Sequence, residues 1–307
     1  MTILFHHAAF SDHRPGPHHP ESPARIKAMM DALAAPAFAG LDRREAPRAT
    51  VEQIARVHPR QFVEALLAAV PAQGEVQIDG DTVMSPGSGE AALRASGAAV
   101  AAVDAVMKGE AKNAFCAVRP PGHHAEPARA MGFCLFNSIA VGALHARAAH
   151  GLDRVAVIDF DVHHGNGTQA AFWDDRDLFY ASSHQSPLYP GTGAAAERGV
   201  GNIVNAPLRP GSGSDEFRAA YRDKILPALR DFQPDIVLIS AGFDAHADDP
   251  LAGLNVATGD YAWVTAELCK VAAETAQGRV VSALEGGYDL HALADAAGAH
   301  VRALMAA

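Results

Sequence analysis

The chain has 307 residues, of which 49% are hydrophobic, so it can supply the core of one large α/β domain. Its 25 lysines and arginines against 35 acidic residues give a formal charge of −10, without any basic run. This balance argues against nucleic acid or an anionic membrane as a direct partner, although basic proteins stay open as substrates. No run of about 18 apolar residues is present for a membrane span.

The cysteines and the N-terminal segment indicate the cellular compartment in which the protein is expected. Cys116, Cys134 and Cys269 are scattered and form no C-x-x-C pair, so we expect no disulfide framework. The N-terminal segment lacks the basic start and apolar stretch of a signal peptide, and we read its histidines as native loop residues. We therefore expect a cytoplasmic protein.

Short apolar strands alternate with alanine-rich helices along the chain. The predicted helices are, in chain order, 23–33, 88–107, 138–150, 214–229, 258–276 and 290–304. The predicted strands are 114–118, 155–160, 178–182, 202–206, 236–240 and 280–284. Ser22 suits the N-cap of the first helix, with Pro23 at its first position. This alternation predicts a parallel sheet with helices on both faces and right-handed crossovers, in a single domain over 1–307.

Polar residues follow five of the six predicted strands. In chain order they are His123 and His124, Asp161 and His163, His184, Asp244 and His246, and the Glu-Gly-Gly-Tyr-Asp segment 285–289. Open parallel sheets bind ligands at the carboxyl ends of their strands. We therefore expect these five clusters to converge on one site.

The segment 155–167 is the most informative, because an apolar run ends in Asp-Phe-Asp-Val-His-His. Alternate side chains of an extended segment point the same way, so Asp159, Asp161 and His163 could share one direction. Buried carboxylates and imidazoles are costly unless something binds them. We propose Asp161, His163 and Asp244 as ligands of a divalent ion such as Zn²⁺, with a coordination position open for catalysis. The alternative is that these carboxylates cap helices or pair with arginines.

The remaining chemistry rests on two histidines and a tyrosine. His123 and His124 are candidate general base and acid, and Asp159 and Asn166 are available to fix their tautomers. Because one partner is charged and the other neutral, the two histidines should titrate differently. Tyr288 lies in a Gly-Gly-Tyr turn and could stabilise an oxyanion. The alternatives are helix-capping loop histidines and an ordinary turn.

Four motifs in this order resemble the zinc-dependent histone deacetylase superfamily, which includes bacterial histone deacetylase-like amidohydrolases and acetylpolyamine amidohydrolases. They are RPPGHHAE, DFDVHHGNGTQ, SAGFDAHADDP and EGGYD, and the similarity runs from His19 to Tyr288. The resemblance implies an arginase-like α/β fold with a central eight-stranded parallel sheet. It also implies hydrolysis of N-acyl amides, with acetyl-lysine side chains as the expected substrates and acetylpolyamines as the alternative.

The resemblance assigns one catalytic zinc to Asp161, His163 and Asp244. It makes His123 and His124 the tandem base and acid, backed by Asp159 and Asn166, and Tyr288 the group that polarises the carbonyl. Asn166 in place of an aspartate resembles the class II branch. A structural K⁺ is implied as well, bound largely through backbone oxygens of Asp159, Asp161, His163, Ser182 and Ser183.

The resemblance also implies a tunnel for the acyl-lysine chain. Phe133 and Tyr189 would form opposite walls, and the Gly132 carbonyl would accept the substrate N–H. Leu251 stands where the polyamine-selective eukaryotic member carries a glutamate, which favours acyl-lysine here. Asp81 could bind a substrate backbone or amine at the rim, or could be a solvated loop residue.

Two rival functions use the same residues. The Asp244-Ala245-His246-Ala247-Asp248 string fits a binuclear ureohydrolase, but a two-metal site needs more carboxylates than the other strand ends offer. A non-catalytic acyl-lysine binder would normally lack a ligand, a dyad histidine or the tyrosine, and this chain has all of them. Relatives often form oligomers, so a homo-oligomer is possible.

Overall fold

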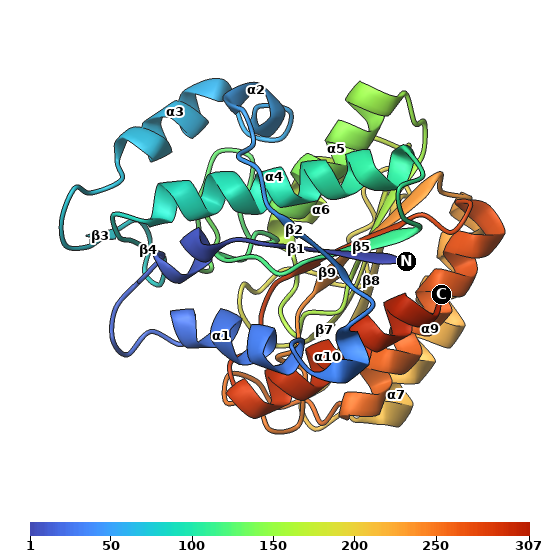
Figure 1. Cartoon of the computed structure of the whole chain (residues 1–307). Helices are drawn as coiled ribbons and strands as arrows, with labels where there is room; N and C mark the ends of the chain where they lie inside the picture. The colour runs from blue at the N-terminus through green and yellow to red at the C-terminus, as the bar shows by residue number, and fades with distance from the viewer.

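In the computed structural model, which describes residues 1–307, an eight-stranded sheet lies between two layers of helices (Figure 1). The strand order is β2-β1-β5-β10-β9-β6-β7-β8, and every neighbouring pair is parallel. The strands are β1 (Thr2–His6), β2 (Asp42–Glu45), β5 (Asn113–Cys116), β6 (Val155–Asp159), β7 (Leu178–Gln185), β8 (Ile203–Leu208), β9 (Ile236–Ala241) and β10 (Val280–Leu284). The predicted eight-stranded parallel sheet in a single domain is confirmed.

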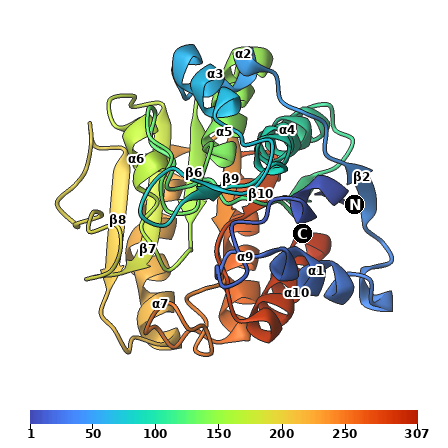
Figure 2. The ribbon, with the colours of Figure 1, turned by 90° about the vertical axis from the view of Figure 1, so that its left-hand side faces the viewer.

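The helices cover both faces of the sheet. They are α1 (Pro23–Ala32), α2 (Val51–Ile54), α3 (Arg60–Ala68), α4 (Ser88–Met107), α5 (Ser138–His150), α6 (Asn166–Phe172), α7 (Ser214–Ala220), α8 (Leu226–Phe232), α9 (Thr258–Thr275) and α10 (Leu290–Ala306). Helices α4 and α5 lie on one face, and α1, α9 and α10 lie on the other (Figure 1 and Figure 2). No helix combines the length and the apolar character that crossing a bilayer requires.

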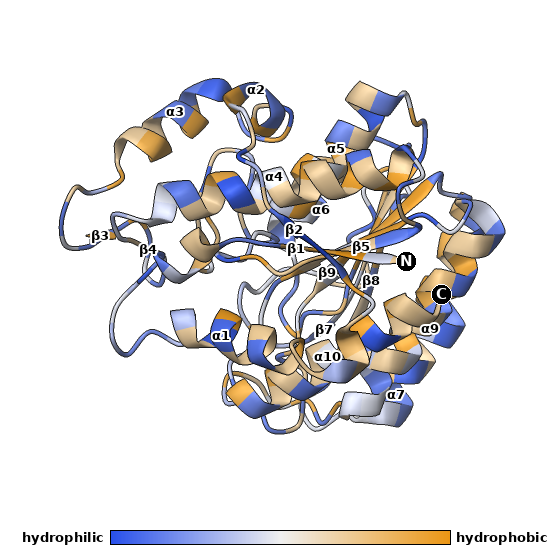
Figure 3. Ribbon diagram, viewed as in Figure 1, coloured by the Kyte–Doolittle hydropathy of each residue, from blue (hydrophilic) through white to orange (hydrophobic).

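The central strands are apolar because both of their faces are covered. Val155–Ile158 of β6 and Ile236–Ile239 of β9 are wholly buried. Figure 3 shows hydrophobic strands in the middle of the molecule, between helices with mixed surfaces. A parallel sheet sandwiched between helices is expected to have such continuous apolar runs, and this is why the sequence identified them as strands.

The peripheral elements differ from the sequence prediction. The edge strand β2 has the sequence Asp-Arg-Arg-Glu and therefore carries no apolar signal. It pairs with β1, which lies in the N-terminal segment whose histidines were interpreted as loop residues. The predicted helix 214–229 consists of α7, a π-helical segment (Tyr221–Ile225) and α8. A short antiparallel hairpin of β3 (Val76–Gln77) and β4 (Val83–Met84) was also missed.

The N-cap prediction at α1 was half right. Pro23 occupies the first turn, but the Ser22 side chain makes no capping hydrogen bond. The backbone N–H of Arg25 donates instead to the Ser22 carbonyl at 3.1 Å. The side chain is therefore not needed to satisfy that donor.

The sheet order explains why a site forms at one edge. The five strands whose ends carry the polar clusters lie side by side in the order β5-β10-β9-β6-β7. Their carboxyl ends point the same way because the strands are parallel. The loops that follow them therefore meet above the middle of the sheet, as expected for ligand sites of open α/β folds.

Candidate functional site

The loops after β6 and β9 bring together Asp161, His163 and Asp244. One potential ligand atom of each lies within 4.8 Å of the others. The Nδ1 atom of His163 lies 3.1 Å from Asp161 Oδ1 and 3.1 Å from Asp244 Oδ2. Both carboxylates are buried, which costs free energy unless a cation compensates them. Two carboxylate oxygens and one imidazole nitrogen form a donor set that fits a divalent ion.

Backbone groups hold these carboxylates in place. The N–H of Gly286 donates to Asp161 Oδ2 at 2.8 Å, and the N–H of Val162 donates to Asp244 Oδ1 at 2.9 Å. A Cβ atom at Gly286 would lie against both carboxylates, so only glycine allows the loop after β10 to approach this closely. The two carboxylates are therefore held in position by their surroundings.

The charges of the cluster point to a cation as well. Burial and the nearby Asp161 raise the pKa of Asp244 to about 7. Burial would lower the pKa of His163, but its hydrogen bonds to Asp161 and Asp244 raise it to about 10. A proton on His163 thus partly neutralises the two carboxylates. A divalent ion would supply that positive charge more completely.

A second group with similar geometry, Asp104, His145 and His150, lies between α4 and α5. The Arg56 guanidinium lies 2.6 Å from His145 Nδ1 and can only donate, so His145 Nε2 must carry the proton that it donates to Asp104. A protonated nitrogen cannot bind a metal, and the guanidinium would repel one. This group therefore joins the two helices.

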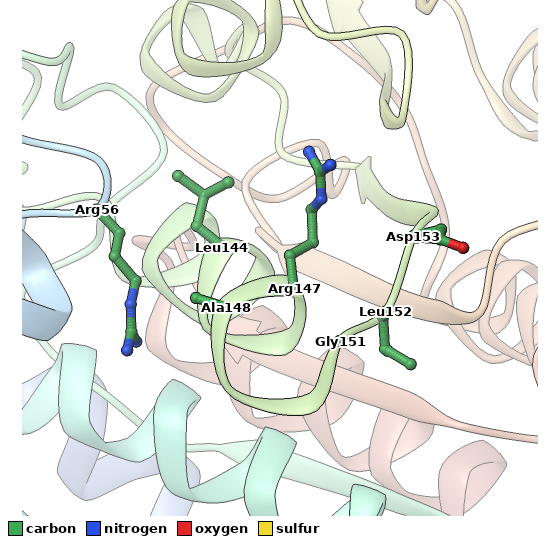
Figure 4. A pocket seen from close by; sticks show the side chains of 7 residues that line it. All are labelled: Arg56, Leu144, Arg147, Ala148, Gly151, Leu152 and Asp153. Atoms are coloured by element: carbon green, nitrogen blue, oxygen red, sulfur yellow. The ribbon is translucent and has the colours of Figure 1, made fainter.

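Figure 4 shows Arg56 beside the end of α5. There it lines an open pocket of about 510 Å³ together with Arg147. None of the residues that follow the five strand ends contributes to this pocket.

The two dyad histidines follow β5 and have different partners. The Nδ1 of His123 lies 2.9 Å from Asp159 Oδ2, and the Nδ1 of His124 lies 2.8 Å from Asn166 Oδ1. Burial lowers the pKa of both, but Asp159 and Asp161 raise the pKa of His123 well above its usual value. The pKa of His124 is well below its usual value, since burial is reinforced by His123. The two imidazoles therefore have one charged and one neutral partner.

Two residues support the dyad in roles that the sequence interpretation did not assign. Glu285 Oε2 accepts hydrogen bonds from the backbone N–H groups of Gly122 at 2.6 Å and His123 at 3.1 Å. The Tyr180 hydroxyl donates to Asp159 Oδ2 at 3.0 Å. Glu285 was noticeable within its motif, whereas Tyr180 lies inside the apolar strand β7 and gave no signal.

Tyr288 is held over the site by residues from two other segments. Arg25 Nε donates to the Gly287 carbonyl at 2.6 Å, and its guanidinium lies 4.8 Å from the centre of the Tyr288 ring. Asp249 Oδ2 accepts the backbone N–H of Tyr288 at 2.6 Å. Burial raises the pKa of Tyr288 well above its usual value, so its hydroxyl keeps its proton and can donate it in a hydrogen bond.

A cavity of about 250 Å³ leads to this centre. Its lining consists of Asp81, His124, Gly132, Phe133, His163, Leu188, Tyr189, Leu251 and Tyr288. The structure thus places all five sequence-predicted substrate residues around one opening, with Leu188 as an addition. The Phe133 and Tyr288 rings pack edge-on with their centres 5.9 Å apart, and the Tyr189 and His124 rings pack edge-on with their centres 5.1 Å apart. Aromatic walls of this kind suit an aliphatic chain.

Gly132 and Asp81 shape the rim of this cavity. Gly132 has a φ of 58°, and a Cβ there would collide with the His124 ring, so the position requires glycine. Asp81 Oδ1 accepts the Gly132 N–H at 3.1 Å and the Thr82 hydroxyl at 3.0 Å. Asp81 is thus half-buried and anchors the aromatic wall, while it still borders the cavity.

Two predicted members of the site lie elsewhere. His184 Nε2 lies 2.9 Å from the Gly193 carbonyl, and His246 Nε2 lies 3.0 Å from the Thr258 hydroxyl. Both side chains hold neighbouring loops. The expectation that all residues after the strand ends converge therefore included too many residues in the site. Ser182, assigned to K⁺, pairs with Asp159 in the β6–β7 ladder.

Comparison with known proteins assigns the chain to a family. The histone deacetylase domain model matches residues 19–304. The chain belongs to the histone deacetylase family. A histone deacetylase-like amidohydrolase of Pseudomonas aeruginosa is 43% identical over 88% of this chain and 71% of its own. The chloroplastic histone deacetylase 14 of Arabidopsis thaliana is 40% identical over 94% of this chain and 73% of its own.

A solved histone deacetylase shares the fold. The crystal structure of the HDA15 HD domain is 35% identical and superposes with a TM-score of 0.94, over 99% of this chain and 88% of that one. A probable deacetylase of Archaeoglobus fulgidus is 36% identical over 94% of this chain and 82% of its own. The histone deacetylase relatives thus include proteins named as deacetylases and as amidohydrolases, which supports a hydrolase.

Proposed function

We propose that this protein is a zinc-dependent deacetylase that hydrolyses N-acyl amides, with acetyl-lysine side chains as its preferred substrates. The observation that carries the proposal is the convergence of three groups at the base of one cavity. These groups are the Asp161–His163–Asp244 cluster, the dyad histidine His124 and the Tyr288 phenol, and each contributes a residue to the lining of the 250 Å³ cavity. Each supplies one element that amide hydrolysis needs.

A zinc ion bound by the cluster would polarise the amide carbonyl and lower the pKa of water. His124, as the neutral imidazole, accepts the proton of the water whose oxygen attacks the carbonyl carbon. The Tyr288 hydroxyl donates a hydrogen bond to the oxyanion that develops on the carbonyl oxygen. As the C–N bond breaks, the dyad returns this proton to the departing nitrogen, and the second proton of the water also passes to it, so that the products are a carboxylate and an ammonium group. His123, paired with Asp159, contributes positive charge beside these steps.

The rim of the cavity supports a peptide substrate. Leu251 offers no charge to a polyamine ammonium, which favours the peptide, while the formal charge of −10 favours approach of any cationic substrate. Asp81 keeps the acetylpolyamine alternative open, because its carboxylate borders the same opening. We also propose a structural K⁺ near the Asp159–Ser182 pair, where backbone oxygens would be its ligands.

A competition assay tests the substrate proposal. Zinc-loaded protein is given an acetyl-lysine peptide and an N-acetylated polyamine together, and release of both amines is followed. We expect preferential release from the peptide. Preference for the polyamine would reverse the substrate assignment, and release from neither would overturn the proposed deacetylase activity.

A further inference from the structure

Glu126 lies two residues after the dyad. It is connected to His124 by a series of hydrogen bonds through Asn166. Its Oε1 accepts a hydrogen bond from Asn166 Nδ2 at 2.8 Å. The Oδ1 of the same Asn166 amide faces His124 Nδ1 at 2.8 Å. Asn166 opens α6, so the chain joins the loop after β5 to the loop after β6.

The orientation of the Asn166 amide decides what His124 can do. The two ends of an amide have nearly the same shape, but one donates hydrogen bonds and the other accepts them. With Oδ1 towards the histidine, His124 must carry its proton on Nδ1, and its Nε2 keeps a free lone pair. With the amide reversed, Nδ1 would be the acceptor, and Nε2 would carry the proton and lose its function as a base.

Glu126 selects between these orientations. A carboxylate can only accept hydrogen bonds, so it pairs with the amide NH₂ group and repels the amide oxygen. The Met131 sulfur, a weak acceptor, lies 3.4 Å from the same nitrogen and favours the same orientation. Asn166 thus determines which nitrogen of His124 carries the proton, without placing a charged group beside that ring. His123, in contrast, has the Asp159 carboxylate as its partner.

The backbone around Glu126 is fixed independently of the dyad. Its N–H donates to the Arg129 carbonyl at 2.9 Å, and its own carbonyl lies 3.1 Å from His58 Nδ1. Its side chain is half-buried and reaches Asn166 rather than a cation. An acidic side chain turned inward onto a neutral amide therefore calls for an explanation other than an ion pair.

We propose that Glu126 is a positioning residue of the deacetylase: it orients the Asn166 amide and thereby sets the tautomer that leaves His124 Nε2 free as a base. This inference rests on the proposed function for its kinetic consequence. The tautomer itself is a property of the protein and is measurable without substrate.

The test combines kinetics with nitrogen-15 NMR of the histidine rings in zinc-loaded protein. Glu126→Ala should lower kcat about tenfold, leave KM within twofold and keep one zinc per chain. Its His124 signal should move from the Nδ1-protonated form towards a mixture of tautomers. Glu126→Gln should retain most of the activity, because its amide oxygen can still accept from Asn166. Glu110→Ala, far from the site and paired with Arg44, is the matched control.

The effect of Glu126→Gln on kcat should change sign in a second variant, which makes the test sharper. Asn166→Asp places two carboxylates against each other, so Glu126→Gln should raise kcat in that background although it does not raise it in the wild type. An equal effect of Glu126→Gln in both backgrounds would overturn the proposal, as would a wild-type His124 protonated on Nε2. A wild type that releases no amine but shows the Nδ1-protonated His124 would contradict the proposed function and leave the positioning role intact.

Discussion

The backbone N–H of Tyr288 donates to Asp249 Oδ2 at 2.6 Å, which ties this tyrosine to a loop 39 residues away in sequence. The same carboxylate also accepts the N–H groups of Asp289 and Leu251. Asp249 therefore holds the Tyr288 turn and the rim residue Leu251 at once. It was not among the residues singled out from the sequence, although it lies within the SAGFDAHADDP motif.

Removing this carboxylate should cost both stability and rate. We expect Asp249→Ala to lower the free energy of unfolding by about 1–3 kcal/mol, because backbone donors lose their acceptor. Displacement of the phenol should lower kcat about 10- to 100-fold. Urea denaturation and steady-state kinetics measure the two effects, and the exposed neighbour variant Asp248→Ala is the control. An Asp249→Ala protein with wild-type kcat would show that the turn keeps its position without the carboxylate.

The Tyr288 hydroxyl should matter far more for turnover than for metal binding. Tyr288→Phe removes one hydrogen bond to the oxyanion, and kcat should fall by about 10²–10³. Elemental analysis should still find one zinc per chain. Tyr189→Phe, which removes a hydroxyl from the cavity wall, should change kcat by only a few fold. Unchanged turnover in Tyr288→Phe would remove the phenol from the mechanism.

The charge at position 251 should shift substrate preference. Leu251→Glu places a carboxylate at the cavity opening, where its attraction to an ammonium is worth about 1 kcal/mol. The ratio of kcat/KM for an acetylpolyamine over an acetyl-lysine peptide should therefore rise about five- to tenfold. Leu251→Gln separates the effect of charge from that of polarity and should leave the ratio near that of the wild type. Equal shifts in both variants would mean that charge at this position is not the cause.

A buried histidine away from the site should make stability depend on pH. His300 is fully buried between the hydroxyls of Thr265 and Ser282, and burial lowers its pKa to about 3. The unfolded chain, with a pKa near 6.5, binds more protons below that pH, so this histidine destabilises the fold as pH falls from about 6.5 towards 3. From pH 7.5 to 5.5 the wild type should lose about 1.4 kcal/mol more than His300→Asn. If urea denaturation shows that both proteins lose the same free energy of unfolding between pH 7.5 and 5.5, then His300 takes up its proton in the folded protein over this range.

The sequence predicted the centre of the fold better than its edges. The strands β5, β6, β9 and β10 were recognisable because burial on both faces makes them continuous apolar runs. The edge strand β2 was not recognisable, since its four residues are all charged and show no apolar pattern. Its existence depends on β1 lying beside it, which no local pattern records.

The same distinction holds for the site. The groups expected to bind the metal and move protons follow the ends of neighbouring strands, and the structure brings them together. The supporting roles of Glu285, Asp249 and Glu126 were not predicted because they consist of hydrogen bonds to groups 39 to 163 residues away. His184 and His246 were wrongly included, because a histidine beside the right strand end can equally hold a loop.

The most direct measurement of the central proposal is amine release from an acetyl-lysine peptide by protein with and without zinc, alongside the Asp244→Ala variant. We expect the wild type to bind one zinc per chain in this cluster, to lose turnover when a chelator strips it and to recover turnover when zinc is restored. Asp244→Ala should bind no stoichiometric zinc and stay inactive. Full turnover in the stripped wild type, or one zinc per chain in Asp244→Ala, would contradict a metal centre built from Asp161, His163 and Asp244.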